Sequence, residues 1–295
     1  MKKVREPAVA GFFYPGSVKD LVEIIEWSFK HSIGPGKLPV LSQQRDRSLI
    51  GYVVPHAGYI YSGPVAAHAY HDLALRGVPE VIIILGTNHT GYGKPISVYP
   101  EGAWRTPLGL LDVDAELGKK VVEYSELADF DVYAHLEEHS VEVQLPFIQY
   151  IFKEKPPKIL PVVIGIHTPE AARDLANAIL TAVEELKRDA VILASSDFNH
   201  YEPHSITVSK DMRAISKILE LDTEGFYNKI MEEDISVCGP GGIMVLMEVT
   251  KKKEGSAELL KHATSGDVQG NKSSVVGYAS IKFFTKQSRA PKLGA

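Results

Sequence analysis

The chain has 295 residues, of which 44% are hydrophobic and 23% charged, and its formal net charge of -5 disfavours a nucleic-acid-binding protein. The basic runs at 251–253 and 286–292 are short and typical of solvated surface lysines. A single cysteine excludes an intrachain disulfide, and no run approaches the roughly 18 apolar residues of a membrane span. We therefore expect a cytoplasmic protein with no membrane and no nucleic acid among its partners.

Four apolar runs predict buried strands. They are rich in β-branched residues and nearly continuous in hydrophobicity, as in parallel strands covered on both faces. They lie at 49–54, 81–85, 159–164 and 190–194. A fifth run, at 274–284, alternates more, so we expect a late strand that is antiparallel or at an edge of the sheet.

Segments with helical spacing of apolar residues lie before, between and after these strands. They are predicted at 18–29, 64–73, 115–124, 141–152, 169–186, 206–219, 223–231 and 241–249. Strands alternating with helices indicate βαβ units. We therefore predict one α/β domain over residues 1–284, with three α/β/α layers and a mostly parallel central sheet. A flexible tail is expected at 285–295.

Three of the predicted strands run directly into a polar loop that carries a histidine. His56 follows the first strand, His89 follows the second, and Asp197 and His200 follow the fourth. The carboxyl ends of parallel strands lie at one edge of an open α/β sheet, where ligands bind. A single histidine after a strand is usually structural, but three at equivalent positions favour a shared site.

Cys238 lies in a glycine-rich turn just before an apolar helix. A helix N-terminus stabilises a thiolate, which is the form that binds metal or attacks as a nucleophile. The alternative is a small buried side chain beside a tight turn. His200 and Asp197 likewise suit proton transfer and its support, or else they pack and cap the following helix.

The remaining polar candidates are less distinctive. His139 precedes Ser140, which resembles a helix start, so it either points into the site or flanks the cap. Arg105 either clamps an anion or lies on the surface in a turn. The other histidines are expected to be packed or solvated, or belong to no recognisable constellation: His31, His68, His71, His135, His167, His204 and His262.

Six motifs occur in a recognisable order along the chain. They are AGFFYPG at 10–16, PHAGY at 55–59, GTNHTG at 86–91, EHSVEVQLPF at 138–147, SSDFNHY at 195–201 and CGPGG at 238–242. Together they resemble the MEMO family, also named AmmeMemoRadiSam system protein B in prokaryotes. The resemblance runs from about Arg5 to Phe284.

The resemblance implies a fold similar to class III extradiol dioxygenases, whose non-haem iron is held by two histidines and a carboxylate. His56 and His89 match the histidine ligands, and Cys238 matches the third ligand of MEMO proteins. His200 matches the catalytic acid/base, with Asp197 beside it. We expect iron or copper, with zinc as a further option, and a substrate pocket formed by His139, Arg105, Asn88 and Tyr59. A cysteine in place of the carboxylate argues against ring cleavage.

Three functional hypotheses follow, in order of preference. The first is a metal-dependent redox enzyme with an open coordination position. The second is a module that kept an enzyme fold and binds a small molecule or peptide. The third is a metal-free cysteine hydrolase with Cys238 as nucleophile and His200 as base. The prokaryotic family name further implies a functional link with radical-SAM and AMMECR-type proteins.

Overall fold

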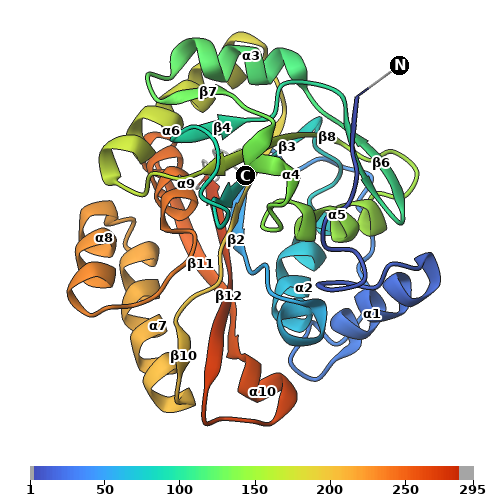
Figure 1. The fold of residues 1–295 in the computed structure, drawn as a ribbon, viewed down its shortest axis with the longest axis vertical. Helices are drawn as coiled ribbons and strands as arrows, with labels where there is room; N and C mark the ends of the chain where they lie inside the picture. Colours follow the sequence, from blue (N-terminus) through green and yellow to red (C-terminus); the bar gives the residue numbers. More distant parts are fainter. Residues whose placement is uncertain (1–2, 286–295) are drawn as a thin grey trace, which may run out of the picture.

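The computed structural model describes residues 3–285 and has a mixed β-sheet between two layers of helices (Figure 1). Four parallel strands form the centre of this sheet, in the spatial order β2 (Leu49–Val54), β9 (Ala190–Ser195), β3 (Val81–Thr87) and β8 (Lys158–Ile164). These are the four strands predicted from the apolar runs. Nearly all their residues are buried, because helices cover both faces.

Antiparallel pairing extends the sheet on both sides. Next to β2 lies β12 (Val275–Thr285), which also pairs with β10 (His200–Glu202) and with β11 (Gly255–Thr264). The late strand is therefore antiparallel, as one of the two predicted options had it. β11 was not predicted, because most of its residues are only partly buried and its sequence lacks clear alternation.

On the far side of β8, two short strands complete the sheet. β4 (Ile96–Val98) pairs with β8 in antiparallel fashion, and β7 (Ala128–Phe130) pairs with β4 in parallel. Each has only three residues, too few for a periodic pattern to be recognised in the sequence.

The two faces of the sheet carry separate hydrophobic cores. Along β3, Ile82 and Ile84 pack into one core while Ile83 and Leu85 pack into the other, since successive side chains point to opposite faces. One face is covered by α1 (Val18–Lys30), α2 (Tyr59–Leu75) and α5 (Leu145–Ile151). The other is covered by α3 (Ala115–Tyr124), α6 (Pro169–Glu185), α7 (His204–Leu219), α8 (Thr223–Glu232) and α9 (Pro240–Lys252). The predicted three-layer α/β/α class is confirmed.

Two predicted helices differ from the structure. Helix α2 begins at Tyr59 rather than residue 64, so Pro64 lies inside it. Pro64 has no N–H for the Ile60 carbonyl, which instead accepts a hydrogen bond of 2.6 Å from Gln269 Nε2. The helix predicted at 141–152 is a 3₁₀ turn, η1 (Glu142–Gln144), followed by α5. The short helices α4 (Tyr133–Leu136) and α10 (Ser265–Gln269) were not predicted.

A second, three-stranded sheet holds the start of the chain, with β5 (Ala103–Thr106) between β1 (Val4–Arg5) and β6 (Gly109–Asp112). The buried Arg5 of β1 forms an ion pair with Glu142 and donates to the carbonyl oxygens of His135 and Glu138 at 2.9 Å. These contacts fasten the loop between α4 and η1 to the N-terminal segment.

Within residues 3–285, no helix combines the length and hydropathy needed to cross a membrane. The single-domain assignment for residues 1–284 stays a prediction. The tail expected at 285–295 lies, apart from Thr285 at the end of β12, outside the described residues.

Candidate metal centre

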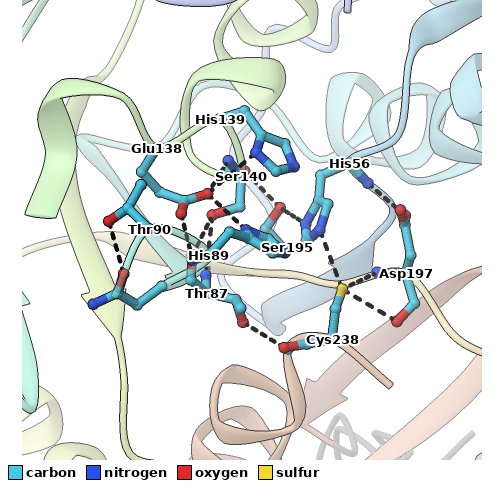
Figure 2. Close-up of polar contacts among 12 residues, drawn as sticks. His56, Thr87, His89, Thr90, Glu138, His139, Ser140, Ser195, Asp197 and Cys238 are labelled. Atoms are coloured by element: carbon cyan, nitrogen blue, oxygen red, sulfur yellow. Dashed lines mark hydrogen bonds and ion pairs between the residues drawn. The ribbon is translucent and has the colours of Figure 1, made fainter. Parts of the chain in front are cut away.

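Three imidazoles meet at the carboxyl edge of the central strands (Figure 2). His56 follows β2, His89 follows β3, and His139 lies in the loop before η1. One ring nitrogen of each lies within 4.8 Å of the other two. The ring of His139 stacks on His89 at 4.5 Å between centroids, and His56 meets both rings edge-on at 5.2 Å. The structure therefore brings His56 and His89 together as expected, and it adds His139 to them.

His56 is the most buried of the three, with 2% of its surface exposed. Its backbone N–H donates to Asp197 Oδ1 at 2.8 Å, and its Nδ1 lies 3.0 Å from Ser195 Oγ. Burial lowers the pKa of His56 well below its ordinary value, and the neighbouring His139 and His89 add to the shift. The ring is therefore neutral near pH 7, which is the form that binds a metal ion.

His89 is oriented by Glu138, a fully buried carboxylate that sequence reasoning missed. Glu138 accepts the backbone N–H of His89 at 2.7 Å and the His89 Nδ1 at 2.9 Å. It also accepts the N–H of Ser140 at 2.8 Å. Burial alone would raise the pKa of Glu138, but the bonds from His89 and Ser140 lower it to about 2. A carboxylate on Nδ1 leaves Nε2 of His89 for a ligand role.

His139 is held between Glu138 and Phe13. Its Nδ1 lies 3.5 Å from Glu138 Oε1, and its ring packs 4.5 Å from the ring of Phe13. Burial lowers the pKa of His139 to about 4, against the opposing effect of Glu138. Glu138 therefore touches two of the three histidines, so one carboxylate organises most of the cluster.

Cys238 lies beside His56 rather than at the middle of the cluster. Its Sγ is 3.1 Å from His56 Nε2 and accepts the N–H of Asp197 at 3.1 Å. Among the described residues, the mutually close group consists of the three histidines without this thiol. Burial raises the pKa of the Cys238 thiol, and the Asp197 carboxylate raises it further. The lowered pKa expected from the helix N-terminus is wrong for this structure, because burial outweighs the dipole of α9.

Asp197 and His200 flank this group from the loop after β9. Asp197 is buried, and burial raises its pKa to about 6. His200 is partly exposed, and its Nδ1 lies 2.8 Å from the carbonyl oxygen of Ser236. A carbonyl only accepts, so Nδ1 of His200 donates this hydrogen bond. A positive charge on His200 would lower the pKa of both Asp197 and His56, because its ring lies near these two residues. His200 does not belong to the group of three mutually close histidines.

The other predicted pocket residues are engaged in different contacts. The buried Tyr59 hydroxyl donates to the Val143 carbonyl at 2.6 Å. The Asn88 side chain forms two hydrogen bonds within its own loop: it accepts the Gly91 N–H at 2.8 Å and donates to the Tyr92 carbonyl oxygen at 2.7 Å. Arg105 lies on β5 and donates to Glu6 at 3.1 Å, so its charge is already paired. Their place in a substrate pocket stays a prediction.

One further histidine reaches this edge of the sheet. His167 follows β8, whose end pairs with the end of β3 at Thr87. Burial lowers the pKa of His167 to about 4, with a contribution from His89, and its Nδ1 accepts the Gly241 N–H at 3.2 Å. The signal was present in the sequence, since His167 also follows a buried strand, three residues after Ile164.

A groove of about 670 Å³ adjoins the loop that carries His89. Two exposed tyrosines, Tyr92 and Tyr133, give it an aromatic wall. The groove is lined by Thr90, Tyr92, Gly93, Lys94, Asp131, Tyr133, Leu136 and Glu137. Of these residues, Thr90 and Glu137 are next in the chain to His89 and Glu138.

An α/β fold with converging histidines at its carboxyl edge defines a candidate metal-binding protein of the open-sheet class. The family model of the Memo-like proteins matches residues 5–282, and the chain belongs to this family. A "MEMO1 family protein" of Desulfurococcus amylolyticus is 63% identical over 284 residues, which is 96% of this chain and all of the relative.

Two further relatives are also named "MEMO1 family protein". The protein of Ignicoccus hospitalis is 52% identical and covers 95% of this chain and 98% of its own length. The protein of Sulfurisphaera tokodaii is 51% identical, with 95% and 99% covered. Among solved structures, an uncharacterized protein of Escherichia coli K12 matches with a TM-score of 0.49 at 12% identity, covering 79% of this chain and 99% of its own.

Proposed function

We propose that this Memo-family protein holds a redox-active transition metal, iron or copper, and uses it in a redox reaction on a small molecule. The observation that carries the proposal is the convergence of His56, His89 and His139, with one nitrogen of each within 4.8 Å of the others. Imidazole suits iron, copper, nickel and zinc, and nearby thiolate favours softer ions such as Cu(I) and zinc.

The donor set fits a metal ion. Nδ1 of His56 and of His89 each has a hydrogen-bond partner within the protein, so Nε2 of each ring is the nitrogen that remains to bind an ion. We assign these two atoms as the core of the site, with His139 and the Cys238 thiol as the remaining protein donors. A histidine oriented by a buried carboxylate, as His89 is by Glu138, is a recurring feature of metal sites.

When bound, iron or copper would supply electron transfer and an open coordination position to the substrate. The chain itself provides proton handling. Nδ1 of His200 donates to the Ser236 carbonyl oxygen, so in the neutral ring Nε2 is the nitrogen that would accept a proton from a substrate. Asp197, with a pKa raised to about 6, can hold or release a proton close to His56.

The groove beside His89 is the proposed place for the ligand. Its tyrosines and Leu136 offer apolar contact, while Glu137, Asp131 and Lys94 offer polar contact. A small molecule or a peptide side chain would fit these surroundings. A cytoplasmic setting belongs to the same proposal, because a thiol that serves as a metal donor must stay reduced.

The experiment is metal analysis of protein purified without added metal or chelator. We expect stoichiometric iron or copper in the parent chain and none in His56→Ala. His71→Ala is the matched control, because His71 is a histidine of α2 that neighbours Lys37 and Asp72 instead of the cluster. Equal metal in His56→Ala and in His71→Ala would overturn the site.

The second candidate is a metal-free cysteine hydrolase. The observation that favours it is the 3.1 Å distance from Cys238 Sγ to His56 Nε2, which makes His56, rather than His200, the base facing the thiol. The raised pKa of Cys238 weighs against it. Fast alkylation of Cys238 by iodoacetamide in metal-free protein would favour this candidate, and slow alkylation favours the metal site. A binding module becomes the better conclusion if the parent chain binds no metal and its thiol is inert.

A further inference from the structure

Ser195, the last residue of β9, connects His56 to a chain of buried hydrogen bonds. Its Oγ lies 3.0 Å from His56 Nδ1, 2.6 Å from the Ser140 carbonyl oxygen and 2.7 Å from Gln144 Nε2. His56, Ser195, Ser140 and Gln144 are each at most 2% exposed. Because water has little access, the direction of each bond is decided within the protein.

The hydroxyl of Ser195 has one proton and two lone pairs. The Ser140 carbonyl oxygen can only accept, so at 2.6 Å the hydroxyl proton must point to it. Turning that proton toward His56 would leave two acceptor oxygens facing each other at the same distance. The lone pairs of Ser195 Oγ therefore receive hydrogen bonds from its other two neighbours.

The amide of Gln144 is fixed in the same way. Its Nε2 also donates to the Pro55 carbonyl oxygen at 3.0 Å, and its Oε1 accepts the Tyr70 hydroxyl. Reversing the amide would bring Oε1 against the carbonyl of Pro55, acceptor against acceptor. Gln144 must therefore donate to Ser195, which leaves His56 Nδ1 as the second donor to the same hydroxyl.

We propose that Gln144 and Ser195 are positioning residues that hold His56 in its Nδ1–H tautomer, with the Nε2 lone pair facing the cluster. The purpose of this arrangement rests on the proposed metal site, but the tautomer is a property of the metal-free chain. The contact of Cys238 with the other ring nitrogen of His56 is consistent with this tautomer. Cys238 Sγ lies 3.1 Å from Nε2, where a thiol proton can be donated to a lone pair.

His56 and His89 are thus oriented by different chemistry. A carboxylate, Glu138, accepts from His89 Nδ1, whereas a neutral hydroxyl accepts from His56 Nδ1. A carboxylate makes its imidazole a stronger donor to a metal, and a hydroxyl sets orientation with a smaller electronic effect. Two ligands of unequal strength would therefore face the same ion.

The test is the tautomer of His56 in metal-free protein, read from imidazole ¹⁵N shifts in long-range ¹H–¹⁵N spectra, with His56→Ala for assignment. We expect the Nδ1–H form in the parent chain. In Ser195→Ala, the ratio of Nδ1–H to Nε2–H should fall by about two- to tenfold, the effect of one neutral hydrogen bond. Affinity for Zn²⁺, used as a redox-inert probe, should fall about 10–100-fold.

Ser280→Ala is the matched control, because Ser280 is also a buried strand serine whose Oγ donates to a carbonyl, that of Val65 at 2.7 Å. It should leave the tautomer and the Zn²⁺ affinity unchanged. An Nε2–H form of His56 in the parent chain overturns the inference even if the chain binds metal. An Nδ1–H form in a parent chain that binds no metal supports the inference and instead refutes the proposed function.

Discussion

Glu138 binds His89 twice, through the backbone N–H at 2.7 Å and through Nδ1 at 2.9 Å. The carboxylate is fully buried and has no contact with solvent. One side chain therefore fixes both the position of the His89 backbone and the rotation of its ring. This double contact makes the position of His89 in the cluster depend on Glu138.

Glu138→Gln should lower metal affinity by about 10–100-fold. Glu138 accepts three N–H groups, two from His89 and one from Ser140, and a glutamine has only one oxygen with which to accept them. The measurement is competition with a chelator of known affinity. Glu137→Gln, at the neighbouring exposed glutamate, is the control and should change little. Equal affinity in both variants would count against a role for Glu138.

His56→Ala and His89→Ala should lose the metal, whereas His200→Ala should keep it. The first two carry the converging nitrogens, but the ring of His200 is held by the Ser236 carbonyl outside that group. Metal content and circular dichroism of each purified variant provide the check. Loss of metal from folded His200→Ala would make His200 a ligand and end the proposed division of roles.

Cys238→Ser should weaken Cu(I) binding more than Fe(II) binding, by at least about tenfold. A hydroxyl is a harder and weaker donor than a thiol, and soft ligands select Cu(I). His139→Ala should weaken both ions, since an imidazole serves either. Anaerobic titrations with each ion distinguish these results. Equal losses of both ions in Cys238→Ser would show that the thiol takes no part in metal selection.

The free energy of unfolding should decrease as the pH is lowered below about 6.5, in part because of His135. Burial lowers the pKa of His135 to about 3, so the unfolded chain takes up a proton that the folded chain does not. The contribution of His135 to the free energy of unfolding is present in full above pH 6.5 and is lost as the pH falls toward 3.

The variant His135→Gln should therefore show a shallower dependence of unfolding free energy on pH. Between pH 4 and 6 the slope should decrease by up to about 1.4 kcal/mol per pH unit, the effect of one proton. Urea unfolding across this range measures it. Parallel curves for parent and variant would contradict the pKa shift, whatever the difference in overall stability.

Gly51→Ala should destabilise the protein by about 2–4 kcal/mol. A Cβ at Gly51 would lie 2.0 Å from the carbonyl oxygen of Ile192 on the neighbouring strand β9, and neither backbone can move without breaking the parallel pairing. Gly16→Ala is the control, because the nearest atom to its Cβ would be 3.7 Å away. Urea unfolding midpoints should separate the two variants; equal midpoints would show that the strands have room to adjust.

The sequence alone determined the layers of this protein and the edge at which its site lies. The runs that became β2, β3, β8 and β9 are continuous in hydrophobicity, and this property follows from burial on both faces whatever the strand order. His56 and His89 could be assigned to one edge for the same reason, since parallel strands carry their carboxyl ends together.

Only the tertiary structure decided which other side chains join them. Glu138 and His139 lie in the loop between α4 and η1 and do not follow a strand directly, so the strand-then-histidine pattern could not assign them to the cluster. The sequence offered His139 only as a pocket residue or a neighbour of a helix cap, and it gave no role to Glu138. Arg5, from the N-terminal sheet, fastens that loop by donating to the Glu138 carbonyl, across 133 positions of sequence. Contacts of such separation depend on how the chain packs as a whole, and periodicity reports only local burial. For the same reason the sequence placed Cys238 near the site but predicted the wrong direction for its pKa. Burial raises this pKa, and the effect of burial is larger than the lowering expected from the helix N-terminus.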